Sequence, residues 1–142
     1  PDDPDGNSLL PYIDTTKTKC LNSRRSGVAN NCFKPYSHRH DGTKFIQSEE
    51  YDPELIIYIP FTVAVTIKSL CISGDQDGSS PAKIKIFKDR NDVDFDLAHD
   101  LKPTVRHCTF IFCILRSQHT CSKYVMMMML MFACYDLWRL DC

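Results

Sequence analysis

Residues 55–72 read LIIYIPFTVAVTIKSLCI, the longest run of strand-forming residues in the chain. The run contains one lysine and no acidic residue. Within it, Val63, Val65 and Ile67 alternate with smaller or polar residues, which is the two-residue period of a strand with one buried face. The run therefore predicts the middle of an antiparallel β-sheet. It indicates an architecture and no particular reaction.

Two local signals divide this run. Pro60 has no N–H to donate to a strand ladder, so it predicts two strands, 55–59 and 61–67, rather than one. After residue 69 the apolar positions change phase, which would turn the side chains to the other face of the sheet. We therefore expect a β-bulge or a corner near Lys68–Ser69.

Further short strands and turns follow the same pattern. The sequence predicts a short strand at 45–48 and a turn at the Gly- and Asp-rich residues 74–81. In the strand 83–88 we expect Ile84 and Ile86 to point inward and Lys83, Lys85 and Lys88 to face water or the strand end. Residues 91–100 show three alternating apolar anchors, Val93, Phe95 and Leu97, and no helix signal that we consider convincing. Together these features predict an all-β fold, a β-sandwich.

The last forty residues differ in character. Residues 103–142 contain all five methionines, the only tryptophan, five of the eight cysteines and no glycine. The segment 109–115 is compatible with one more strand. The segment 124–140, YVMMMMLMFACYDLWRL, has high helix propensity but no polar face, so we expect a tail that is helical or disordered.

Composition excludes several classes of protein. A length of 142 residues fits one domain, and a net charge of −1 argues against an electrostatic binder of nucleic acid. We expect a disordered leader at residues 1–7 without a signal peptide, because the start is acidic and rich in proline. No apolar run reaches the roughly 20 residues that span a bilayer. The eight cysteines form no CxxC pair, so we expect neutral thiols rather than redox chemistry.

Four groups of residues resemble functional sites, and for each the plain structural interpretation is favoured. A zinc site is one hypothesis for the tail, but the gap between its first two cysteines is long for paired ligands. The loop 75–78 (DQDG) resembles the start of a calcium loop but lacks the Gly and Glu that an EF-hand needs later. The tail residues of the zinc hypothesis are His107, Cys108, Cys113, His119 and Cys121.

The remaining two groups lie near the N-terminus. His38, His40 and Asp41 could suggest acid–base chemistry, but no nucleophile motif accompanies them. A basic and aromatic group could instead suit an acidic partner or nucleic acid, although a short charge run is more often a solvated loop. This group comprises Arg24, Arg25, the lysines of 34–44, Phe33, Tyr36 and Phe45.

A series of short segments resembles the PITH domain, a proteasome-interacting module found at the C-terminus of a thioredoxin-like protein and also alone. The resemblance covers residues 8–102, and the phrases FKP (33–35) and IPFT (59–62) look most like the stand-alone members. It implies a jelly-roll β-sandwich of the galactose-binding type, in a cytosolic or nuclear protein without catalytic residues or cofactors. It also implies association with the proteasome regulatory particle, and no nucleic acid or membrane partner. The matching segments are 9–14, 20–22, 33–35, 44–48, 54–56, 59–62, 65–74, 81–88 and 94–95.

After residue 102 the pattern of the family is lost. We therefore divide the chain into a leader (1–7), a partial PITH domain (8–102) and a divergent tail (103–142), and we expect a sandwich without its closing strands. Unpaired backbone groups cost about 1–3 kcal/mol each, against a domain stability of about 5–15 kcal/mol. On this basis the isolated chain should be insoluble or partly unfolded. The alternative function is a jelly roll that binds a carbohydrate or another small ligand, and no partner-binding residue is assigned.

Overall fold

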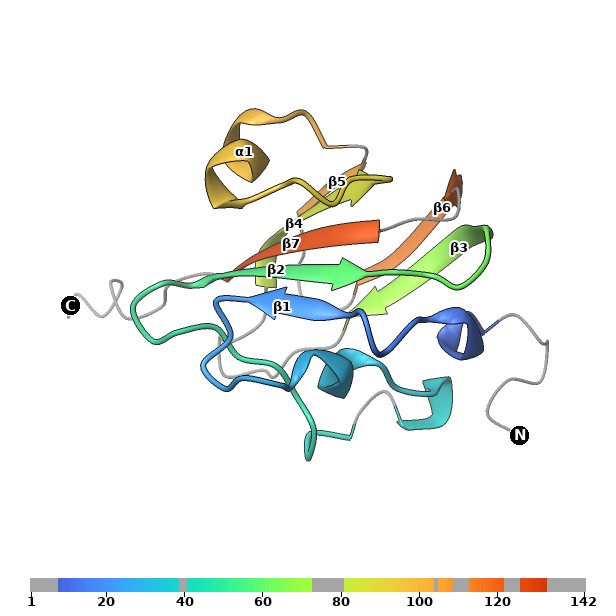
Figure 1. Cartoon of the computed structure of the whole chain (residues 1–142), viewed down its shortest axis with the longest axis horizontal. Helices are drawn as coiled ribbons and strands as arrows, with labels where there is room; N and C mark the ends of the chain where they lie inside the picture. The colour runs from blue at the N-terminus through green and yellow to red at the C-terminus, as the bar shows by residue number, and fades with distance from the viewer. Residues whose placement is uncertain are drawn as a thin grey trace, which may run out of the picture.

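The computed structural model describes residues 8–38, 41–72, 81–103, 105–108, 113–121 and 126–132, the last three segments and residues 36, 68, 69, 71 and 82 by their backbone alone. Strands dominate these residues, and one short α-helix accompanies them (Figure 1). The strands are β1 (Lys19–Leu21), β2 (Glu54–Ile59), β3 (Val65–Ile72), β4 (Pro81–Lys88), β5 (Val105–Cys108), β6 (Cys113–Cys121) and β7 (Met126–Phe132). The helices are α1 (Phe95–Asp100) and three 3₁₀ turns, η1 (Leu10–Tyr12), η2 (Ala29–Cys32) and η3 (Tyr36–His38).

The strands form two sheets. One has five strands in the order β1-β2-β7-β4-β5, and the other pairs β3 with β6. All the neighbouring strands run antiparallel. The prediction of a mostly β fold is confirmed.

The main core lies between the two sheets. Its buried members come from β2, β3 and β4 and from Phe61, which follows β2. The opposite face of the five-stranded sheet carries a second cluster in which Ile56 and Phe87 pack with Val93 and Ala98, and Ala98 belongs to α1. The sheet is therefore covered on both faces, and successive residues Leu55, Ile56 and Ile57 are all nearly inaccessible.

The two breaks in the opening stretch are confirmed. β2 ends at Ile59, before Pro60, and β3 begins at Val65 in the other sheet. The register of β3 against β6 shifts between Ile67 and Ser69, where the change of phase predicts a bulge. The second strand starts later than predicted. Phe61 makes only an isolated bridge, to Ile13, and a bend at residues 62 and 63 follows it.

The prediction for Lys85 is wrong. Ile84 is buried as expected and Lys83 is exposed, but only 5% of Lys85 is accessible. Lys85 shares its face of β4 with Phe87, and α1 covers that face beside Ala98. β4 is also an interior strand of its sheet, between β7 and β5.

The sequence predicts no helix in residues 91–100, and this prediction is also wrong. Phe95–Asp100 form α1, and the Asp94 side chain accepts a hydrogen bond from the Leu97 N–H at 2.8 Å. Asp is a strong N-cap, and this bond satisfies one of the unpaired donors of the first turn. The alternation of Val93, Phe95 and Leu97 is typical of a strand, and it outweighed the Asp94 cap in the prediction.

The helical prediction for the tail is wrong at Met126–Phe132. This segment is β7, which runs from Glu54↔Met131 to Ile59↔Met126 against β2 and pairs with β4 on its other side. An apolar run without a polar face suits a central strand as well as a buried helix, and periodicity alone does not separate them. The expectation that β2 and β4 lack ladder partners is therefore wrong as well. The rest of 124–140, the leader 1–7 and residues 109–112 lie outside the described residues.

Candidate interaction surface

A small hollow lies where two loop segments meet beside the five-stranded sheet. We call it the loop hollow, and it holds a volume of about 60 Å³. Pockets for small molecules usually measure about 300–1,000 Å³, so the loop hollow has room for a side chain rather than for a cofactor. Its lining residues are Arg24, Arg25, Val28, Asn31, Thr43, Phe45 and Gln47.

Hydrogen bonds between the two loops build the hollow. Ser23 and Ser48 form an isolated bridge, and the Arg24 N–H donates to the Gln47 carbonyl at 2.9 Å. The Asn31 side-chain amide donates to the Phe45 carbonyl at 3.4 Å. Segments 14–25 residues apart in the sequence are thus held side by side by backbone pairing and by one side-chain hydrogen bond.

The two arginines of the hollow differ in their partners. Arg24 contacts Glu50 at 3.5 Å, and about half of each side chain is exposed. Within the described ranges, the Arg25 guanidinium makes no ion pair or hydrogen bond. Phe45 lines the same hollow and is 55% exposed.

The structure brings together part of the predicted basic and aromatic group. Arg24, Arg25 and Phe45 share the hollow. Phe33 instead packs against the main core, and the Lys34 ammonium donates to the carbonyl of Asp41. The side chain of Tyr36 lies outside the described residues, as do Arg39 and His40.

The acid–base hypothesis gains no support from the described members of its group. His38 Nδ1 lies 2.9 Å from the Ser37 hydroxyl, and both side chains are exposed. The Thr43 side chain and N–H bond the Asp41 carboxylate and hold its pKa below the usual value. Asp41 is thus a turn-forming carboxylate, with its charge stabilised, rather than a base with a raised pKa.

The two metal hypotheses, which the sequence disfavours, stay untested. His107 and Cys108 lie on β5, whereas Cys113, His119 and Cys121 lie on β6 in the other sheet, and none of their side chains is described. The DQDG loop at 75–78 also lies outside the described ranges. No cluster of three His, Cys, Asp or Glu side chains suited to a metal occurs among the residues whose side chains are described.

The two cysteines whose side chains are described are neutral thiols. Burial raises the pKa of Cys20 to about 11 and that of Cys32 to about 12. Both pack against the main core, and each thiol lies near a backbone carbonyl, that of Leu21 or Ala29. Their environment matches the predicted structural role, because the thiolate is the reactive form.

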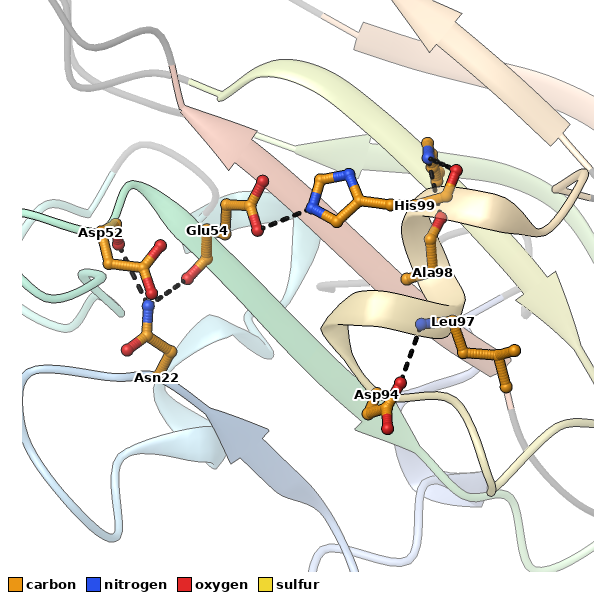
Figure 2. Close-up of polar contacts among 8 residues, drawn as sticks. Asn22, Asp52, Glu54, Asp94, Leu97, Ala98 and His99 are labelled. Carbon is orange, nitrogen blue, oxygen red and sulfur yellow. Dashed lines mark hydrogen bonds and ion pairs between the residues drawn. The ribbon is translucent and has the colours of Figure 1, made fainter.

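A second polar region attaches α1 to the sheet (Figure 2). The Lys85 ammonium donates to the carbonyls of Ala98 at 2.7 Å and of His99 at 3.3 Å, which belong to the last turn of α1. That turn carries the negative end of the helix dipole and unpaired carbonyls, so a cation is stabilised there. The His99 ring lies 3.1 Å from a carboxylate oxygen of Glu54 on β2.

The same region continues into the loop before β2. Asn22 has a positive φ of 64°, a conformation that asparagine tolerates better than most residues. Its side-chain amide donates to the carbonyls of Asp52 and Glu54 at 3.1 and 2.9 Å (Figure 2). No motif in the sequence marks Asn22, Lys85 or His99 as part of this region. Only the Asp94 cap, ahead of α1, is a signal that the sequence carries locally.

Among the residues that the structure describes, no helix is long and apolar enough to cross a membrane.

Comparison with known proteins identifies the family. The PITH domain profile matches residues 1–111. A PITH domain-containing protein of Drosophila pseudoobscura is 44% identical over 89 residues, and PITH domain-containing protein 1 of Danio rerio is 44% identical over 88. The human PITH domain-containing protein 1 is 38% identical over 88 residues.

These alignments cover 62–63% of this chain and 41–42% of each relative, so the chain spans less than half the length of the relatives it matches. The predicted resemblance is confirmed by an independent profile that covers most of the chain. The chain belongs to the PITH domain family.

Proposed function

We propose that this chain is a non-enzymatic protein-interaction module that associates with the proteasome regulatory particle in the cytosol or nucleus. The observation that carries the proposal is the PITH profile match over residues 1–111, because PITH domains are proteasome-interacting modules. The partner is proposed from the family, since the chain spans only part of its relatives.

The described surface is compatible with a protein partner. Large exposed side chains of the kind that anchor interfaces occur on its loops, with Phe45 55% and Tyr51 93% exposed. Arg25 is exposed in the same loop region as Phe45. Arginine and aromatic residues supply a large share of binding energy at protein interfaces.

We also propose that the domain division follows the resemblance. The leader is 1–7, the PITH-like part is 8–102 and the divergent tail is 103–142. In this proposal the tail differs from the family in sequence but still contributes β5, β6 and β7 to the two sheets. Removing residues 103–142 should therefore unfold the PITH-like part, because its two sheets would lose these three strands.

Affinity capture tests the proposed function. The full chain, tagged at its N-terminus, should enrich subunits of the regulatory particle from a cytosolic extract, as identified by mass spectrometry. A full-length PITH domain-containing protein 1 serves as the positive control, and a tagged β-sandwich of another family as the negative control. Recovery by the positive control but not by this chain would refute the proposal.

A second candidate is a jelly roll that binds a carbohydrate. Phe45 lines the loop hollow together with Asn31 and Arg25, and an aromatic ring beside such polar groups is the feature expected of a sugar site. The volume of about 60 Å³ is small for this role. A glycan array would support the candidate by selective binding that the substitution Phe45→Ala abolishes, and a blank array would exclude its common ligands.

A further inference from the structure

We propose that the loop hollow holds an acidic peptide segment of the partner, in which carboxylates flank an apolar or aromatic side chain. This inference rests on the proposed function, because it names the contact surface through which that function would operate. The argument depends on three features of the hollow: its cations, its exposed ring and its rigid frame.

The cations are available to an incoming carboxylate. Arg25 is exposed, and within the described ranges no acidic side chain pairs with it. Arg24 already contacts Glu50 at 3.5 Å, but exposed pairs of this kind contribute little stability and exchange readily. A guanidinium offers a planar set of donors that matches a carboxylate in a bidentate contact.

The ring supplies the apolar part of the contact. Phe45 is 55% exposed although it lines the hollow, so a partner would remove further apolar surface from water. The Val28 side chain lines the same hollow, and the volume of the hollow suits one inserted side chain. A segment with an apolar residue between carboxylates therefore fits both features at once.

The frame is preorganised. The bridge Ser23↔Ser48, the bond from the Arg24 N–H to the Gln47 carbonyl and that from Asn31 to the Phe45 carbonyl join the two loops before a partner arrives. Backbone order that exists beforehand need not be acquired on binding, which lowers the entropic cost of association.

The neighbouring charges favour a peptide over a nucleic acid. Glu49, Glu50 and Asp52 follow the hollow along the chain, and Glu50 contacts Arg24 itself. A continuous phosphate backbone would meet these carboxylates, whereas a short acidic peptide can direct one or two carboxylates to the arginines. The net charge of −1 also lacks the basic excess of a nucleic-acid binder.

The test compares four versions of the full chain: the wild type, Arg25→Glu, Phe45→Ala and the control Lys102→Glu. Lys102 is exposed after α1 and makes no interaction among the described residues, so its variant repeats the charge change away from the hollow. Circular dichroism should show the same melting temperature for all four. The probe is a short fluorescent copolymer of glutamate and tyrosine, of peptide length, measured by anisotropy. Capture of the regulatory particle is the second readout.

We expect the wild type and Lys102→Glu to bind the copolymer alike, and Arg25→Glu and Phe45→Ala to bind it roughly tenfold or more weakly, as for residues at the centre of an interface. The same two variants should lose the regulatory particle. Equal copolymer binding by all four proteins, or loss by Lys102→Glu as well, would overturn the inference. Preferential binding of a single-stranded RNA with the same dependence on Arg25 would overturn the peptide as occupant.

The two readouts separate the inference from the proposed function. If the wild type and both hollow variants capture the regulatory particle equally, the loop hollow is not the contact surface, and the proposed function is still supported. If the wild type binds the copolymer through the hollow but captures no particle, the proteasome is wrong as the partner and the acidic occupant is supported.

Discussion

Replacing Lys85 with methionine tests how α1 is attached to the five-stranded sheet. Methionine keeps most of the length of the buried stem and removes the ammonium that donates to the Ala98 and His99 carbonyls at 2.7 and 3.3 Å. His99 is exposed, so water can replace the lysine at its carbonyl. Ala98 is fully buried, so its carbonyl would lose a partner that water does not easily replace.

The expected loss follows from that carbonyl. A buried polar group left unsatisfied costs about 1–3 kcal/mol, and hydrogen bonds to charged groups contribute about 1.5–3 kcal/mol. Burying an ammonium carries a penalty of several kcal/mol, and removing the charge returns part of it. We expect a net destabilisation of about 2 kcal/mol, which lowers the melting temperature by about 4–8 °C in a domain of this size.

Urea and thermal unfolding followed by circular dichroism measure this change. The matched control is Lys83→Met, two residues earlier on the same face of β4 but exposed, where we expect a change within about 0.5 kcal/mol. The reasoning is refuted if Lys85→Met is as stable as the wild type or more stable. It is also refuted if both variants lose the same amount, because burial under α1 would then not be the cause.

Three further predictions concern the cap, the thiols and the tail. Asp94→Ala should destabilise the protein by about 1 kcal/mol in urea unfolding, because the Leu97 N–H loses its cap, and Asp94→Asn should restore most of the loss. With raised pKa values of about 11 and 12, Cys20 and Cys32 should react with iodoacetamide at pH 8 far more slowly in the folded protein than in urea. The pKa values of both thiols are raised in the folded state, so the stability that they contribute is complete below their ordinary pKa of 9.0 and falls as the pH rises toward 11–12. A free energy of unfolding in urea that does not change across that pH range would contradict their burial. Amide hydrogens of Met126–Phe132 should exchange as slowly as those of Glu54–Ile59, because β7 pairs on both sides, whereas exchange within seconds would contradict its central place.

Local signals were sufficient to predict the centre of the fold. Pro60 ends a strand because it has no N–H to donate, whichever sheet the next strand joins. The change of phase at Lys68–Ser69 marks a bulge, whichever strand pairs with it. Both features depend on a few adjacent residues, so no knowledge of the tertiary structure was needed.

Other features depend on segments that are distant in the sequence. The burial of Lys85 requires α1, whose last turn lies more than ten residues later and supplies the accepting carbonyls. The methionine-rich segment 126–132 forms a strand because β2 and β4 leave a place between them, and tertiary pairing overrides its helix propensity.

The candidate surface was only partly predictable. Residue type alone pointed to Arg24, Arg25 and Phe45, but it could not distinguish Phe45 from Phe33, which packs against the core. The bridge between Ser23 and Ser48 brings two polar loops together without any sequence motif, so the hollow itself could not be predicted from the sequence. The premise of the predicted insolubility, strands without ladder partners, does not hold for β2 and β4, because β7 pairs with both.

Direct binding to purified proteasome regulatory particle tests the central claim, that this chain is a PITH interaction module. In biolayer interferometry with the full chain immobilised, we predict saturable binding with a Kd of about 10 µM or below that weakens as salt is raised, because arginine contacts are screened. Immobilised human PITH domain-containing protein 1 is the positive control, and an immobilised unrelated β-sandwich is the negative control. If the positive control binds the particle and this chain gives a signal no greater than the negative control, the claim is contradicted.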